Sequence, residues 1–464
     1  MIQYFSSHFE PVLSSYDLND ATWFCLSLLL IVAVFFRFNR LLSLRNLDLL
    51  LLLAISPGLL FLHEDYRNDG SHLGYLWLFV CSGLLLLRLF LDSRFRRRPL
   101  LEQNLNAAGL GFLCVAAFAF QVTRVVMEPM PESTLATVHG AKEMLSRQDT
   151  SGGGNASGEN DPAEFVPGPA TKVVVAMGGV APVTIVAGTS DPSHTEIMAA
   201  RLVACLSHLA VVAGLILLGR RHLGDVKLGV AMATLYLLMP GTALKVSNVN
   251  HILPAAFVIW ALVYYSRPMI AGCLMGLACG TVFFPAFLLP LWVAFYGRQG
   301  AIRFGLALGI ISAGLLSTFA LTAADSQSFL RQFVGSIDWS VMQLQTDRPG
   351  QGFWSNDWTP YRLPMMAGFV VMVCVLTIFP RSKNIEHLMA HSAAIVVGTQ
   401  LWYPQGGGVY VLWYLPLVLA VVFRPRLTHL VPPESAPLLR AARERLDQAR
   451  KERTFSSTGR HKLR

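Results

Sequence analysis

Acidic side chains gather in one short polar segment of this chain, from His63 to Gly70. Glu64 and Asp65 follow His63 directly, and Asp69 comes four residues later. A carboxylate placed in this way can act as a general base on an acceptor hydroxyl, or can hold a divalent cation near a phosphate. The alternative is a solvated loop whose acidic charge serves no chemistry. We take Glu64 and Asp65 as the candidate catalytic residues, with His63 and Asp69 as candidate substrate contacts.

A second polar group opens an apolar run further along the chain. Asn248, Asn250 and His251 stand at its start, and Lys245 precedes them. Polar side chains at a helix N-terminus can cap the helix, and they can also bind an anionic group there. Lys245 favours a phosphate contact, and all four residues are candidates for substrate binding.

The stretch before residue 362 is rich in both aromatic and charged residues. Tryptophan faces stack on sugar rings, while Asp and Arg side chains bond to hydroxyls or phosphates. The alternative is an aromatic belt at a membrane interface. The candidate substrate contacts here are Arg348, Trp354, Asp357, Trp358 and Arg362.

Known cofactor and metal motifs do not occur in the sequence. We find no P-loop, no G-x-S-x-G elbow and no zinc-ligand spacing among the seven cysteines. No metal-ligating residues are therefore predicted. No cofactor is assigned beyond a divalent cation as a candidate at the carboxylates.

The composition of the chain indicates that membrane-spanning helices position these residues. Of 464 residues, 53% are hydrophobic and only 14% are charged, whereas a soluble domain carries roughly 25% charge. The sequence therefore predicts a multi-pass protein of the cell (plasma or inner) membrane, in contact with membrane lipid. The net charge of +9 fits the positive-inside rule and is not taken to indicate a nucleic-acid partner.

Apolar runs and basic loops predict an all-α polytopic fold with about 13 transmembrane helices, the N-terminus outside and the C-terminus inside. The expected segments are an outer N-terminal segment (1–20), four transmembrane helices (21–123), a large and partly disordered outer loop (124–197), the remaining helices (198–423) with an outer loop (323–361), and a basic cytoplasmic tail (424–464). Residues 172–188 are apolar but short, and are expected to form a strand or an interfacial loop.

One long apolar stretch, residues 269–296, is expected to form two short helices broken near Thr281–Pro285, because the flanking Arg267 and Arg298 then lie on the same side. Its glycines Gly272, Gly276 and Gly280 recur every four residues. They share one helix face and allow close helix contact. The turn after Trp402 is expected to be a hairpin with aromatic anchors.

Residues 198–300 resemble the GT-C class of membrane glycosyltransferases, in particular the GT87 group of polyprenyl-phosphate-dependent mannosyltransferases. The motif of that group has a polar-Val-Asn start, an apolar span, a basic turn, a Gly/Ala-rich helix and a Phe-Pro pair. The matching positions are Val249-Asn250, Arg267-Pro268, Ala271-Gly272, Gly276-Leu277-Ala278 and Phe284-Pro285. Val282 stands where the group often has lysine.

The resemblance implies a hexose, with mannose as the candidate, that is carried on a polyprenyl phosphate and transferred to an envelope acceptor at the outer face with inversion. Glu64 or Asp65 would be the base. Lys245, Asn250 and His251 would approach the phosphate, and Arg348 or Arg362 would replace the missing lysine. Trp354 and Trp358 would stack on the sugar or the acceptor. Two other classes stay open: a multi-pass transporter or lipid flippase, and a catalytically inactive protein of envelope assembly.

Overall fold

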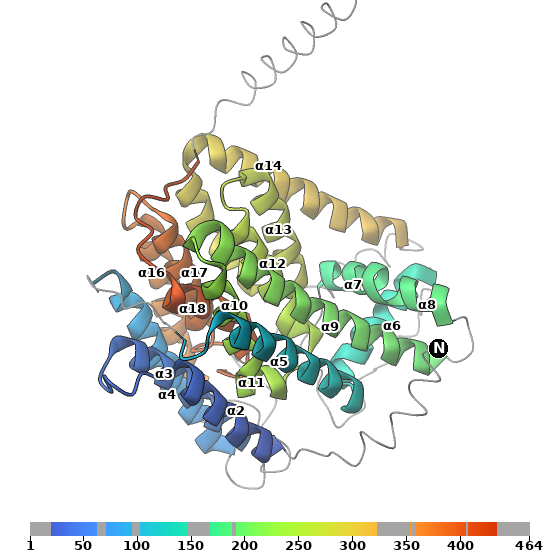
Figure 1. Ribbon diagram of the computed structural model, residues 1–464. Helices are drawn as coiled ribbons and strands as arrows, with labels where there is room; N and C mark the ends of the chain where they lie inside the picture. Colours follow the sequence, from blue (N-terminus) through green and yellow to red (C-terminus); the bar gives the residue numbers. More distant parts are fainter. Residues whose placement is uncertain are drawn as a thin grey trace, which may run out of the picture.

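The apolar runs of the sequence form α-helices in the computed structural model of the chain (Figure 1). The structure describes residues 20–62, 71–94, 103–146, 168–187, 192–322, 353–354, 359–404 and 407–433. Every regular element within these ranges is helical: α2 (Asp20–Phe35), α3 (Leu44–Phe61), α4 (Ser71–Phe90), η2 (Leu91–Arg94), α5 (Ala107–Met127), α6 (Glu132–Ser146), α7 (Pro169–Val175), η3 (Ala176–Val180), α8 (Ala181–Ala187), α9 (Pro192–Leu218), η4 (Gly219–Leu223), α10 (Val226–Leu238), α11 (Pro240–Leu244), α12 (Val249–Val263), α13 (Pro268–Thr281), η5 (Phe284–Leu288), α14 (Leu289–Thr322), α16 (Thr359–Ile378), α17 (Ile385–Thr399) and α18 (Val411–Phe423).

Six helices of the described chain are long and apolar enough to cross a membrane. They are Leu44–Phe61, His72–Phe90, Ala107–Met127, His194–Leu223, Phe284–Leu321 and Pro360–Ile378. A straight transmembrane helix needs about 20 mostly apolar residues, which these helices supply. The chain is therefore a helical membrane protein, as its composition predicts.

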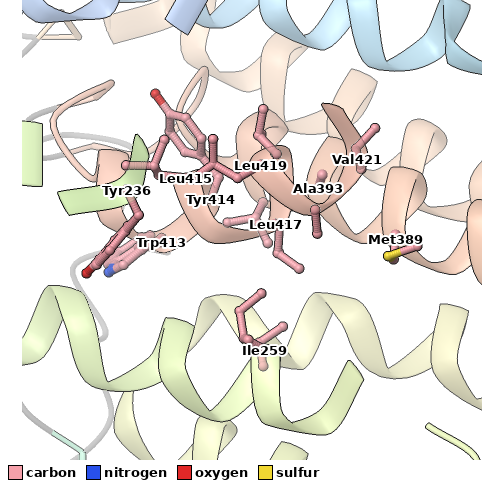
Figure 2. Packing of buried hydrophobic residues seen from close by; sticks show 14 of the residues in the cluster. Tyr236, Ile259, Met389, Ala393, Trp413, Tyr414, Leu415, Leu417, Leu419 and Val421 are labelled. Atoms are coloured by element: carbon pink, nitrogen blue, oxygen red, sulfur yellow. The ribbon is translucent and has the colours of Figure 1, made fainter. Parts of the chain in front are cut away.

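Short helices occupy the centre of the bundle. α18 is apolar on every side, and all of its residues except Val422 are buried, as expected for a helix enclosed by other helices. Leu417 of α18 points toward Ile259 of α12, and Leu419 lies on the opposite side of α18 (Figure 2). α12 and α18 begin at the same end of the bundle, since His251 contacts Tyr410 there. We call this the Asn248 end, and the end where α18 finishes the Arg424 end.

The break predicted in the long apolar stretch is present. α13 ends at Thr281, and Val282 is extended, with φ −145° and ψ 164°. The 3-10 turn η5 follows, with Pro285 at its start, and leads into α14. The extended Val282 ends the helical conformation, and Pro285 has no backbone N–H with which to continue the hydrogen bonds of α13. Together they explain why the helix stops here.

The glycine face of α13 lies against the second half of α14. A Cβ at Gly272 would lie 2.3 Å from the Phe304 carbonyl oxygen, and one at Gly280 would lie 2.6 Å from Leu315 Cδ1. Because the contact positions increase together along both segments, these segments run parallel. The chain must therefore reverse twice between them, first at the break that follows Thr281 and again at Gly297, whose φ of 62° and ψ of −177° interrupt α14.

Replacing Gly272 with alanine should lower the thermal unfolding midpoint. The new methyl group collides with a backbone carbonyl, and such overpacking costs about 1–3 kcal/mol. Gly305→Ala in α14 is the matched control, because a Cβ there meets nothing within 4 Å. Alanine favours a helix over glycine by about 1 kcal/mol, so the control should keep or raise the midpoint. Equal behaviour of the two variants in detergent would contradict the close approach.

Residues 172–187 correct a prediction, because they are helical where a strand or an interfacial loop was expected. They lie in α7, η3 and α8, which Figure 1 shows beside α6 and the start of α9. Gly179 lies directly against α9, where a Cβ would be 2.6 Å from Val203 Cγ2. The valine-rich sequence favours a strand locally, but packing onto α9 overrides that weak preference. α6 to α9 share a hydrophobic core of their own, which includes Val138, Val175 and Val203.

A chain of buried ion pairs joins four segments at the Arg424 end. Arg88 of α4 bonds Asp48 of α3, with an Nη2–Oδ2 distance of 2.8 Å, and Asp92 of η2, with an Nη1–Oδ1 distance of 3.0 Å. Arg424, directly after α18, pairs with Asp92 and reaches Glu386 of α17 at 2.9 Å. Glu386 also accepts a hydrogen bond from the backbone N–H of Leu427. The network therefore fastens α3, α4, α17 and the end of α18 to one another.

A small cavity of about 50 Å³ lies beside this network, lined in part by His387, His391 and Arg424. His387 also completes a capping box with Asn384 at the start of α17. In the preceding connection, Lys383 donates hydrogen bonds from Nζ to the carbonyls of Thr377 and Pro380 at 2.6 and 2.9 Å. Burial lowers the pKa of this lysine.

Candidate functional site

The polar side chains at the start of α12 are buried, and several of their oxygen atoms have no hydrogen-bond partner. Ser247, Asn248, Asn250 and His251 are each less than 9% exposed. Asn248 occupies the N-cap position of α12, yet its side chain makes no capping hydrogen bond. The capping interpretation is therefore wrong for Asn248. The Oδ1 atoms of Asn248 and Asn250 and the Oγ atom of Ser247 are buried without a hydrogen-bond partner.

Asn250 has its amide orientation fixed by α6. The Thr137 hydroxyl donates its hydrogen to the Ser133 carbonyl at 2.7 Å. A hydroxyl has one hydrogen, so toward Asn250 Thr137 can only accept. Asn250 Nδ2 donates to it at 3.3 Å, and Oδ1 therefore faces away as an acceptor. A buried acceptor without a donor costs about 1–3 kcal/mol, so this arrangement calls for an explanation.

His251 lies in a cluster of aromatic rings. Its ring centroid is 5.0 Å from that of Tyr410 and 6.3 Å from that of Trp413. Tyr410 and Trp413 stack at 4.2 Å, and Phe284 stacks on Trp413 at 4.6 Å. Tyr403 meets Tyr410 edge-on at 4.9 Å. The cluster therefore joins the start of α12, the break after α13 and the turn before α18.

Arg362 and Trp354 are anchored to that same turn. The Arg362 guanidinium is fully buried and donates from Nε to the Trp402 carbonyl at 2.9 Å. It also interacts electrostatically with Tyr403. Trp354 is 2% exposed and donates its indole N–H to the Leu401 carbonyl at 3.1 Å. Burial makes Trp354 an anchor of the turn in this structure.

The structure links Arg362 and Trp354 to Trp402 and Leu401. Tyr403, the next residue, meets Tyr410, which contacts His251. Lys245 lies half-buried just before Asn248. The remaining predicted residues, namely His63, Glu64, Asp65, Asp69, Arg348, Asp357 and Trp358, lie outside the described residues. In the part of the chain that is described, no group of three or more His, Cys, Asp or Glu side chains could hold a metal ion.

A buried chain of hydrogen bonds, which no sequence pattern predicted, holds the backbone that leads to Asn248. His208 of α9 lies 3.0 Å through Nε2 from the Val246 carbonyl, and 2.9 Å through Nδ1 from the Tyr236 hydroxyl. The carbonyl can only accept, so Nε2 carries the hydrogen and Nδ1 accepts from the tyrosine. Thr242 in turn donates to the Tyr236 carbonyl at 2.6 Å. These contacts fix the bend between α10 and α12.

Other contributors were also missed from the sequence. Thr134 of α6 donates to the Ser247 carbonyl at 3.0 Å, and Thr137 orients Asn250. Threonines in a polar helix carry no signal of such a contact. Tyr410 and Trp413 open α18 three residues apart, and this spacing places both rings on one helix face. That pattern could have suggested an aromatic site, because both rings begin an apolar run.

Two helix N-termini meet at this point. α12 and α18 both begin without a side-chain cap, and their first residues are linked by the contact of His251 with Tyr410. Uncapped N-termini carry the positive ends of the helix dipoles, which suit an anion such as a phosphate. Some first-turn N–H groups are already used, since those of His251, Val411 and Trp413 donate to nearby carbonyls. The site thus combines two helix N-termini, acceptors on Asn248 and Asn250, and a buried cluster of aromatic rings.

Comparisons of this chain with protein-family models, with curated proteins and with solved structures find no match. What the site can bind is therefore inferred from its own side chains and backbone groups.

Proposed function

We propose that the protein is an integral membrane glycosyltransferase. It moves a hexose from a polyprenyl-phosphate sugar to an envelope acceptor at the Asn248 end of the bundle. The observation that carries the proposal is the meeting of two uncapped helix N-termini beside buried asparagine acceptors and aromatic rings. A sugar phosphate needs all three kinds of group, since its phosphate accepts hydrogen bonds, its hydroxyls donate them and its ring stacks.

The proposed topology has about 13 spans, with the Asn248 end facing out and the Arg424 end facing the cytoplasm. The parallel course of α13 and the second half of α14 supports it, because Arg267 and Arg298 then lie at the same end. The location that follows is the plasma or inner membrane.

The buried ion pairs at the Arg424 end favour a transferase over a transporter. A path between α3, α4, α17 and the end of α18 would have to part helices that Arg88 and Arg424 fasten together. A transferase needs access from one side only. In the proposed mechanism Glu64 or Asp65 removes the proton of the acceptor hydroxyl, which attacks the anomeric carbon as the lipid phosphate leaves.

The test is a transfer assay with purified protein and a panel of polyprenyl-phosphate sugars. We expect transfer of at least one hexose, and a fall of about 10²–10⁴-fold in Glu64→Gln or Asp65→Asn, the usual contribution of general base catalysis. Glu132→Gln at the exposed start of α6 is the control for loss of an acidic charge. If no sugar is transferred, or if neither carboxylate variant differs from the control, the proposal is wrong.

A further inference from the structure

We propose that Asn248 and Asn250 recognise hydroxyl groups of the transferred sugar by accepting hydrogen bonds, and do not bind the phosphate. The inference rests on the proposed function and assigns a part of its site. The sequence placed Asn250 near the phosphate, because a polar residue at a helix N-terminus suits an anion. The orientation of the Asn250 amide instead indicates a hydrogen-bond donor, such as a sugar hydroxyl, as its partner.

Asn250 has an acceptor that no group in the described part of the protein satisfies. One N–H of its amide nitrogen donates to Thr137, whose own hydrogen is committed to the Ser133 carbonyl. The remaining Oδ1 atom is buried without a partner. A phosphate oxygen has no hydrogen to give, so it would repel Oδ1, whereas a sugar hydroxyl would donate to it.

Asn248 adds a second acceptor next to the first. It is 7% exposed, its side chain does not cap α12, and its Oδ1 atom has no partner. Ser247, 4% exposed, adds a hydroxyl that is also unpaired. Three unsatisfied groups within four residues are unusual, since most buried polar atoms in native proteins are hydrogen-bonded. A polyol satisfies all three at once, because each of its hydroxyls both donates and accepts.

The backbone then takes the phosphate. The N–H groups at the start of α12 and α18 are donors only. The site therefore divides its donors and acceptors between the two parts of a lipid-linked sugar. The asparagines would then make the sugar-bearing lipid bind more tightly than the lipid phosphate that remains after transfer. This difference favours release of the lipid phosphate.

The test measures binding of two probes to the full chain in nanodiscs: polyprenyl-phosphate mannose and the same polyprenyl phosphate without sugar. Asn248→Leu and Asn250→Leu should each weaken binding of the first at least tenfold, and change binding of the second by less than twofold. Asn384→Leu is the matched control, because Asn384 also occupies an N-cap but accepts a bond from the His387 N–H at 3.0 Å.

Thermal unfolding provides the second readout. Asn384→Leu should lower the midpoint because it removes a cap, whereas Asn248→Leu should leave it unchanged or raise it, since the replaced group had no partner. Equal loss of both probes, no loss of either, or a fall in the Asn248→Leu midpoint like that of the control would each overturn the inference. So would failure of the unaltered protein to bind the mannose-bearing lipid.

The outcome separates this inference from the proposed function. Selective loss of the sugar-bearing lipid, in a protein that transfers no sugar, would keep the sugar-binding site and overturn the transferase. Normal transfer and unchanged binding in both asparagine variants would keep the transferase and overturn the inference.

Discussion

Replacing Arg424 with methionine should destabilise the protein by about 3–5 kcal/mol, the usual cost of breaking a buried ion pair. Arg424 is 3% exposed and contacts both Asp92 and Glu386. Its loss leaves carboxylates buried without that cation, inside a part of the bundle with little access to water. The measurement is the free energy of unfolding, or the thermal midpoint, of the protein in detergent.

Two further variants make this prediction specific. Arg426→Met removes an arginine from the same segment but at an exposed position, where charge changes usually matter little. Adding Asp92→Asn to Arg424→Met should recover part of the loss, because the buried charge that Arg424 balanced is then removed, while Arg88 keeps its pair with Asp48. If Arg426→Met lost as much stability as Arg424→Met, or if the double variant recovered none of it, the ion pairs would not be what stabilises the Arg424 end.

Truncating Trp413 to alanine should cost about 3–5 kcal/mol, the range measured for large aromatic residues in packed interiors. Trp413 is fully buried and stacks on Phe284 and Tyr410. It joins the break after α13 to the start of α18, so its removal leaves a void at the Asn248 end. The unfolding midpoint reports the loss directly, and binding of lipid-linked sugar should weaken with it.

Trp413→Phe is the control for this prediction, because a smaller ring keeps the stacking while the cavity shrinks. We expect it to lose less than half of what the alanine variant loses. If the two variants were equally stable, Trp413 would not be the support that its contacts indicate.

Local patterns in the sequence were sufficient for much of the fold. Hydropathy predicted a helical membrane protein, and the regular spacing of Gly272, Gly276 and Gly280 predicted a face of close contact, because both depend on residues near one another in the chain. The break before Pro285 follows from the missing N–H of proline in the same way. Residues 172–187 were misjudged because their helical state depends on packing against α9.

The candidate site was found only in part, for a different reason. Asn248 and His251 could be selected because polar residues stand out at the start of an apolar run. Whether Asn248 caps the helix depends on one side-chain orientation, which composition does not encode. Tyr403 was expected only to anchor a hairpin. In the structure it meets Tyr410, and Tyr410 contacts His251, a residue far away in the sequence. Local patterns do not reveal such a contact. Charge bias likewise placed Arg424 in a cytoplasmic tail without revealing its two buried partners.

The shortness of the central helices has a consequence for the surrounding bilayer. α10, α12, α13 and α18 contain 13, 15, 14 and 13 residues, so each is about 20 Å long at about 1.5 Å per residue. The hydrocarbon layer is about 30 Å thick, and α9, with 27 residues, is long enough to cross it. The central group is therefore about 10 Å shorter than the hydrocarbon layer is thick. Under the proposed function, the headgroup of a lipid-linked sugar would have to move below its own layer to reach Asn248 at the start of the short helix α12.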